Sequence, residues 1–391
     1  MNKLVVLLML MLFFLVQSVE GQVDSVRVSL MTCAPGTEIY ALFGHTALRY
    51  EDTANGEDWV FNYGMFSFDA PHFVYRFVKG ETDYELGVIR YPYFEASYAM
   101  RGSSVYQQIL NLTTAEKKRL KKLLEENYLP ENRVYRYNFF YDNCTTRARD
   151  AIEKCVNGKI VYPEGKENIS FRDIVHQYTE SHAWDELGID LCLGAEADVP
   201  IDARKQMFAP FYLLEAAKGA MIVEGDSIRP LVLQEKKVVD VQSADEEGDF
   251  PLSPWLCMCV LMGWGCFMGW WQLKTGKVIW LWDLFLFGTQ GVAGCVIAFL
   301  VFFSVHPTVG SNWLVFLFNP LPLIYLPVLV YRGVKGQKDL FHVINVVYLT
   351  LFIMIVPFIQ QKINVTVLPL ALCLLICSAS HLFLYYRRNN K

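Results

Sequence analysis

FGHTALRY, residues 43–50, and YDNCTTRARD, residues 141–150, are the two stretches around which this chain is organised. The first places His45 at the start of a strand-like run, and the second places Cys144 at the opening of a helix. A thiol is a strong nucleophile only as the thiolate, which a helix N-terminus and a nearby imidazole both stabilise. The pair therefore predicts a cysteine–histidine site for acyl transfer, with Cys144 as the nucleophile and His45 as the base.

The residues around Cys144 favour this interpretation over a structural one. A lone cysteine at a helix start is commonly a buried packing residue, and a lone histidine commonly has a structural role. Here Asp142 or Asn143 can cap the helix, which leaves N–H groups of its first turn to stabilise an oxyanion. The other histidines before the apolar region lie in loop- or helix-like contexts and have weaker claims: His72, His176 and His182.

A general base also needs a partner on its second ring nitrogen. Asn62, in the segment WVFNYG, lies on the partner strand of a predicted hairpin, where cross-strand neighbours can share a face. We therefore expect Asn62 to orient His45, with Asp69 and Glu38 as the alternatives.

Residues 22–222 are expected to form one α+β domain, because strands and helices follow each other without regular βαβ alternation. Asn55-Gly56 between two β-rich runs predicts the turn of the hairpin. Thr113 or Thr114 is expected to cap a charged amphipathic helix that Pro130 ends. The other strands are expected at 23–32, 105–112 and 133–140, and the helices at 115–127 and 144–156.

The N-terminus has the pattern of a secretory signal peptide, at residues 1–21. Lys3 supplies the positive charge, residues 4–16 the apolar core, and residues 19–21 a cleavage site before Gln22. The apolar core is short for a transmembrane helix, which favours a cleaved signal peptide; an uncleaved anchor is the alternative. A cleaved signal places the α+β domain outside the cytoplasm, in the periplasm.

After an acidic linker at residues 223–252, residues 253–391 are expected to form an all-α membrane domain. Lysine and arginine gather in the segments that follow the first, third and fifth apolar runs, and the other loops are poor in both. By the positive-inside rule this charge pattern predicts a cytoplasmic C-terminus and a multi-pass protein of the inner membrane. The five runs, each long enough to cross ~30 Å of hydrocarbon, lie at 254–273, 278–303, 312–332, 339–359 and 364–386.

The composition agrees with a membrane protein, because 53% of the 391 residues are hydrophobic and only 19% are charged. The net charge of −5 gives no argument for nucleic-acid binding. Inside the apolar runs, Asp283, His342 and His381 stand out, either as functional groups or as residues near an interface.

The exported cysteines show no spacing typical of a metal site or a disulfide framework. An oxidising compartment permits disulfides, so a Cys33–Cys155 or a Cys155–Cys192 bridge stays open. We expect neither a metal ion nor a cofactor.

The motifs MTCAPG, FGHTALRY, VFNYGMFSFDAP and NCTTRARD, between a signal peptide and several spans, resemble those of the Lnb-type lipoprotein N-acyltransferases of Bacteroidetes, formerly a domain family of unknown function. The order of histidine before cysteine is also similar to permuted papain-like enzymes, the NlpC/P60 and lecithin:retinol acyltransferase relatives. This likeness implies a small antiparallel sheet that carries His45, packed on the helix that carries Cys144. The resemblance assigns the base and the nucleophile to these two residues and leaves the role of Asn62 as an inference from position.

The function implied by the resemblance is lipoprotein N-acylation. An acyl chain passes from a membrane phospholipid to Cys144 as a thioester, and then to the N-terminal amine of a diacylglyceryl-cysteine lipoprotein. Two alternatives remain: an envelope cysteine peptidase or amidase of NlpC/P60 type, and a non-enzymatic membrane protein of the envelope in which Cys144 is only packed.

Overall fold

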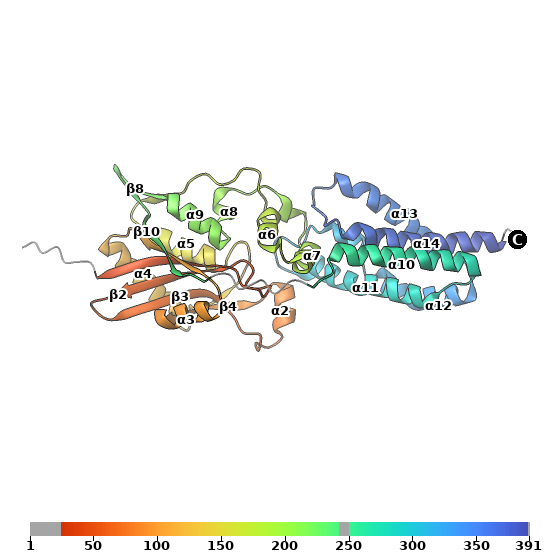
Figure 1. Ribbon diagram of the computed structural model, residues 1–391, viewed down its shortest axis with the longest axis horizontal. Coiled ribbons are helices and arrows are strands. Elements are labelled where there is room, and N and C mark those ends of the chain that lie inside the picture. The colour runs from red at the N-terminus through yellow and green to blue at the C-terminus, as the bar shows by residue number, and fades with distance from the viewer. Residues whose placement is uncertain (1–24, 242–249, 390–391) are drawn as a thin grey trace, which may run out of the picture.

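The computed structural model describes residues 25–241 and 250–389, and Figure 1 shows a head of strands and short helices beside a bundle of long helices. The expected signal peptide at 1–21 lies outside the described residues, as does the central part of the expected acidic linker, at 242–249.

A seven-stranded sheet of antiparallel neighbours forms the centre of the head, in the order β10–β5–β1–β2–β3–β4–β6. The hairpin of β2 and β3 turns at Asn55-Gly56, and Gly56 has φ 65, as this turn dipeptide predicts. The strands are β1 (Val26–Cys33), β2 (His45–Asp52), β3 (Glu57–Met65), β4 (Asp83–Arg90), β5 (Val105–Leu110), β6 (Val134–Arg136) and β10 (Val232–Val239).

Helices cover both faces of this sheet. α4 (Thr114–Tyr128) and α5 (Cys144–Cys155) share a core with one face, and α3 (Tyr91–Met100) shares a core with the other. Successive residues of a strand point to opposite faces, so Leu30 of β1 belongs to the first core and Met31 to the second. The α+β prediction is confirmed for the head.

Two predictions for the head are wrong. The strand expected at 133–140 is limited to β6, because the Asn138 side chain accepts the N–H groups of Phe140 and Tyr141 at 3.1 Å and bends the chain into a turn. The segment expected to start a linker at residue 223 is folded to Val239. There β10 pairs with β5, and β8 (Met221–Glu224) and β9 (Ser227–Pro230) form a small sheet with β7 (Lys159–Val161).

Short helices flank the main sheet, and two of them, α6 and α7, lie between the sheet and the long helices (Figure 1). A separate core at α6 contains Phe140, Phe171, Ile174 and Phe208. The helices are α2 (Phe73–Lys79), α6 (Phe171–Thr179), α7 (Ala183–Cys192), η1 (Ala195–Asp198), α8 (Ala203–Gln206) and α9 (Pro210–Gly219).

The C-terminal part contains five helices long and apolar enough to cross a membrane, which confirms the predicted all-α membrane domain. The third span begins with a short helix, η2 (Trp313–Phe316), and continues after Pro320 as α12 (Leu321–Lys335). The other four contain α10 (Pro254–Thr275), α11 (Trp280–Phe303), α13 (Leu340–Ile355) with η3 (Val356–Phe358), and α14 (Val367–Asn389).

The head is hydrogen-bonded to the outer loops of the membrane domain. The N–H of Gly194 donates to the carbonyl of Thr308 at 2.7 Å, and the side chain of Asn364 donates to Asp190 at 2.9 Å. Arg172 holds Asp190 in place for this contact. It is fully buried and forms ion pairs with Asp190 at 2.5 Å and with Asp198 at 2.9 Å. A fully buried ion pair fixes geometry because breaking it leaves unpaired charge. The head is therefore held against the bundle at a defined place.

Candidate active site

Cys144 is the first residue of α5, and Asn143 is the cap of that helix. The Asn143 carboxamide oxygen accepts the N–H groups of Thr145 and Thr146, both at 2.9 Å. Asp142 has a different role, since it forms a two-bond ion pair with Arg147 at 2.6 and 2.8 Å. Among the described residues, no acceptor takes the N–H of Cys144. This N–H is left for a ligand, whereas the next two N–H groups are used by the cap.

His45 begins β2 at a position that only glycine can precede. Gly44 has φ +75, and a Cβ there would lie 2.4 Å from the carbonyl oxygen of Cys33. One residue later, the Thr46 hydroxyl forms a buried hydrogen bond of 3.0 Å with the hydroxyl of Thr145 on α5. This bond ties the start of the strand to the start of the helix. The His45 imidazole and the Cys144 thiol are thereby brought close enough for each to shift the pKa of the other.

Asn62 lies on the other side of the imidazole. Its carboxamide oxygen is 3.3 Å from Nε2 of His45, and its carboxamide nitrogen donates to the carbonyl of Val60 at 3.3 Å. The second bond fixes which end of the carboxamide faces the histidine, and it leaves Nδ1 of His45 for the thiol. Asp69 and Glu38 are exposed and, within the described part of the chain, do not contact His45. The structure thus brings the three predicted residues together.

The electrostatics of the pair favour the charged forms. Burial raises the pKa of the Cys144 thiol, but the charge and hydrogen bond of His45, with bonds from the Thr46 N–H and the Thr145 hydroxyl, bring it below the usual value. Burial lowers the pKa of His45, but the Cys144 charge and the bonds to Cys144 and Asn62 raise it above its usual value. A thiolate beside an imidazolium is the state from which a cysteine nucleophile reacts.

Cys144 and His45 both line a cavity of about 500 Å³, a size typical of small-molecule sites. Its lining is mostly aromatic and aliphatic, and it comes from both parts of the molecule. The head contributes Phe43, Phe66 and Tyr137 among others, and α11 of the membrane domain contributes Val296 and Leu300. An apolar cavity that joins the thiol to the outer end of a membrane helix can accept a hydrocarbon chain.

Tyr135 is a residue of this region that the sequence did not single out. Its phenol oxygen is buried and has no hydrogen-bond partner among the described residues. A Cβ at Gly64 would lie 3.9 Å from this oxygen and 3.6 Å from Cβ of Cys144, so both groups border Gly64. An unpaired buried hydroxyl costs roughly 1–3 kcal/mol. Because residues 133–140 are expected to form one strand, the sequence does not distinguish Tyr135 from its neighbours. Asn138, a turn-forming residue, is the signal that separates the strand from the turn.

The other exported cysteines differ from Cys144. Cys33, Cys155 and Cys192 are all free in the described structure, so neither of the bridges left open by the sequence is present. Burial raises the pKa of the Cys33 thiol to about 12 and the pKa of Cys155 above its usual value. These thiols are protonated at neutral pH, whereas the environment of Cys144 stabilises its thiolate.

The remaining histidines of the head lie elsewhere. His176 contacts Asp190 at 2.9 Å in the contact region with the membrane domain, and His182 lies 3.9 Å from Asp185. His72 is the exposed residue before α2, with φ 55. None of the three lines the cavity that contains Cys144.

Comparison with known protein families agrees with this two-part arrangement. Residues 18–179 match the family model described as the Lnb N-terminal periplasmic domain, and residues 245–389 match the model described as the Lnb transmembrane domain. No curated protein and no solved structure matches the chain. Because the two family models together cover most of the head and the whole helical bundle, this chain belongs to the Lnb family, as a multi-pass membrane protein with a periplasmic N-terminal domain.

Proposed function

We propose that this protein is a lipoprotein N-acyltransferase, in which Cys144 carries the acyl group as a thioester. The observation that supports this proposal best is the cavity: the Cys144–His45 pair opens into an apolar space whose walls come from the head and from α11. A soluble substrate would not need a wall made by a membrane helix, whereas an acyl chain of a membrane lipid would.

In the first step the Cys144 thiolate attacks an ester carbonyl of a phospholipid. The carbon–sulfur bond forms, and the bond between the carbonyl carbon and the glycerol oxygen breaks. His45, as the imidazolium, gives its proton to the leaving glycerol oxygen. The free N–H of Cys144 is suited to hold the oxyanion, and the unpaired phenol of Tyr135 is the neighbouring group available to help it.

In the second step the acceptor is the unprotonated N-terminal amine of a diacylglyceryl-cysteine lipoprotein. The amine attacks the thioester carbonyl and loses a proton to neutral His45. The carbon–sulfur bond breaks, so the Cys144 thiolate and the His45 imidazolium are restored. The hydrogen bond that Nε2–H of His45 donates to the carboxamide oxygen of Asn62 holds the imidazole in one orientation through both steps.

The proposed location is the inner membrane, with the head on the periplasmic side. Donor and acceptor both lie in the outer leaflet of that membrane. Hydrogen bonds from the head to the outer loops keep the thiol at that level, which raises its effective concentration toward lipids.

The apolar lining also distinguishes this proposal from the alternatives. A peptidase or amidase of the NlpC/P60 type acts on polar cell-wall peptides, for which hydrogen-bonding walls are expected. A merely structural Cys144 would have a thiol pKa raised by burial, as Cys33 has, rather than lowered.

Intact mass spectrometry tests the proposal directly. The full-length protein in detergent is incubated with a phospholipid of defined chains, and we expect a mass increase of one acyl chain that peptide mapping assigns to Cys144. The Cys144→Ala and His45→Ala variants should show no increase. Absence of the adduct in the wild type, or an adduct on another cysteine, would contradict the proposal; release of peptides from a cell-wall substrate would favour the peptidase instead.

A further inference from the structure

A second group of reactive side chains lies inside the membrane domain, away from the cavity of Cys144. Oδ1 of Asp283, on α11, is 2.9 Å from Nε2 of His381 and 3.3 Å from Sγ of Cys377, both on α14. The three residues are at most 8% exposed. Cys377 and His381 are four residues apart on one helix and therefore face the same side. All three potential ligand atoms lie within 4.8 Å of one another.

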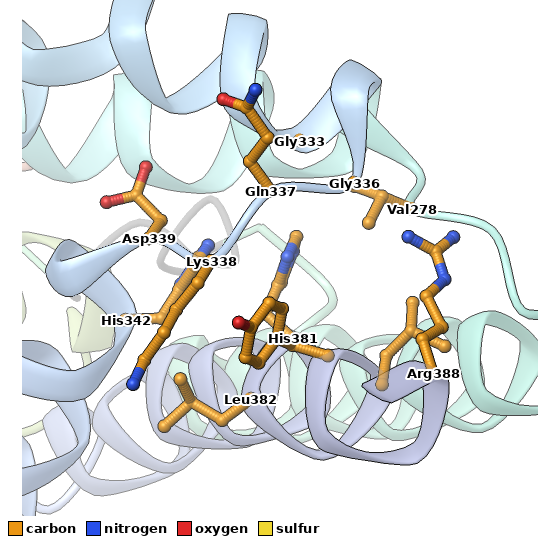
Figure 2. A pocket seen from close by; sticks show the side chains of 12 residues that line it. Val278, Gly333, Gly336, Gln337, Lys338, Asp339, His342, His381, Leu382 and Arg388 are labelled. Carbon is orange, nitrogen blue, oxygen red and sulfur yellow. The ribbon is translucent and has the colours of Figure 1, made fainter. Parts of the chain in front are cut away.

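The second oxygen of Asp283 has no partner among the described residues, although it is buried. It faces α12, since a Cβ at Gly333 would lie 3.9 Å from it. Next to the cluster, Gly333, His342 and His381 line a small pocket of about 20 Å³. Such a volume holds one water molecule. Figure 2 shows His342 and His381 between the turn that carries Gly336 and the helix that carries Leu382.

An unpaired carboxylate is costly in a membrane, so it is normally neutralised by a partner. A protonated His381 would neutralise the carboxylate at Oδ1, but it would leave Oδ2 without a hydrogen-bond donor. A divalent cation bound at Oδ1 would neutralise both the carboxylate and a thiolate, and Oδ2, which has no partner among the described residues, would accept a hydrogen bond from a water molecule on the metal. The charge and the donor types of this cluster thus agree with a metal complex of no net charge.

We propose that Asp283, Cys377 and His381 bind a divalent transition-metal ion of the zinc class. One carboxylate oxygen, one thiolate and one imidazole are ligands that Zn²⁺ accepts in tetrahedral geometry, with a water molecule as the fourth. Ligand atoms at bond lengths of about 2.1 Å lie about 3.4 Å apart around a tetrahedral ion. The distances of 2.9 and 3.3 Å in the structure need to widen by only a few tenths of an ångström.

The neighbouring histidine supports the imidazole rather than competing with it. The ring of His342 stacks on the ring of His381 at 3.9 Å with an angle of 14°. Its Nδ1 lies 3.3 Å from the hydroxyl of Ser378, which also accepts a bond from Asn345 at 2.8 Å. These contacts hold the His381 ring in the orientation in which its Nε2 faces Asp283.

The ion would join α11 to α14. α11 also provides Val296 and Leu300 to the wall of the reaction cavity. The metal would therefore hold α11, the helix on which that wall depends, against α14. The sequence did not suggest it, and we expected no metal there, because one ligand comes from the second span and the other two from the fifth.

Co²⁺ is the probe, because a Co²⁺–thiolate complex absorbs visible and near-ultraviolet light. The full-length protein in detergent is treated with a chelator and titrated with Co²⁺, and then Zn²⁺ is added to displace it. All variants carry Cys144→Ala, since the Cys144 thiolate can also bind the probe. The matched pair is Cys377→Ser and Cys373→Ser; Cys373 is equally buried one turn earlier on α14, where its thiol contacts the carbonyl of Leu261 at 3.6 Å.

We expect one equivalent of Co²⁺ with a thiolate band in the parent and in Cys373→Ser, and loss of that band in Cys377→Ser. Asp283→Asn should weaken binding at least tenfold, because the charge of the ligand is lost. Zn²⁺ should also raise the unfolding temperature of Cys373→Ser and leave that of Cys377→Ser unchanged. A parent without the band, or equal binding by the two serine variants, would overturn the proposal.

Discussion

Gly188→Leu tests whether the apolar cavity holds the acyl chain. Gly188 lies on α7 and lines the cavity, and no atom lies within 4 Å of the place where its Cβ would be. A larger side chain can therefore extend into the cavity without displacing the protein. The change also removes a helical glycine, which destabilises a helix by about 1 kcal/mol relative to alanine. The variant should fold at least as well as the wild type.

The size of the effect follows from the volume that the side chain takes. Leucine has three more carbon atoms than alanine, so it displaces about three methylene groups of a bound chain. Each methylene removed from water contributes about 0.8 kcal/mol, so the loss is about 2.4 kcal/mol. At 1.36 kcal/mol for each factor of ten, kcat/KM of Gly188→Leu for a long-chain donor should be roughly 60-fold lower than that of Gly188→Ala. Gly188→Ala, which makes the same helix change without the bulk, should stay close to the wild type.

The assay measures the rate of acyl-enzyme formation by intact mass spectrometry, with phospholipids of graded chain length. The ratio of wild-type to Gly188→Leu rates should increase with chain length and approach one for the shortest donors, which leave that part of the cavity empty. Equal slowing of short and long donors would refute the reasoning, because the substitution would then act on the fold or on the Cys–His pair.

Three further changes probe the site and its support. Asn62→Ala removes one of the hydrogen bonds that raise the pKa of His45, so the alkaline limb of the pH–rate profile should move to lower pH. The rate should also fall roughly fivefold, for a bond of ~1 kcal/mol. The control is Asn127→Ala, which loses a bond of 2.7 Å to Tyr63 and should leave the profile unchanged. Tyr135→Phe should lower kcat about a hundredfold with little change in KM if the phenol stabilises the oxyanion, and an unchanged kcat would exclude that role. Arg172→Leu removes the buried cation that neutralises Asp190 and Asp198 and should lower the free energy of unfolding by about 3–5 kcal/mol, measured by chemical denaturation.

The positions of Cys144 and His45 could be predicted because each carries a local signal. Asn143 is a favoured helix cap directly before the cysteine, and Gly44 permits the close approach that places the histidine. Asn62 followed from the strong turn signal of the hairpin, which sets which strand is the neighbour of β2. These signals act over a few residues, and a single sequence contains them.

The parts that could not be predicted depend on contacts between distant residues. The charged run of β10 looks like a linker because the strand lies at the edge of the sheet, where exposed charges are normal. The cavity combines Phe43, Tyr137 and Leu300, which no periodicity connects. Tyr135 differs from its neighbours only through the absence of a partner for its hydroxyl, which appears once the packing is known.

The membrane domain is more than an attachment to the bilayer. One of its helices, α11, lines the cavity that contains the thiol. Gly194 lies so close to the outer loop that a Cβ there would be 2.7 Å from the carbonyl carbon of Ser311, so the backbones of the head and the loop are in direct contact. A head separated from the bundle would keep the Cys144–His45 pair and lose one wall of the cavity. The separated head should therefore react with small thiol reagents but accept long-chain donors poorly, because the reactivity of the thiol is set within the head and the binding of the chain depends on both parts.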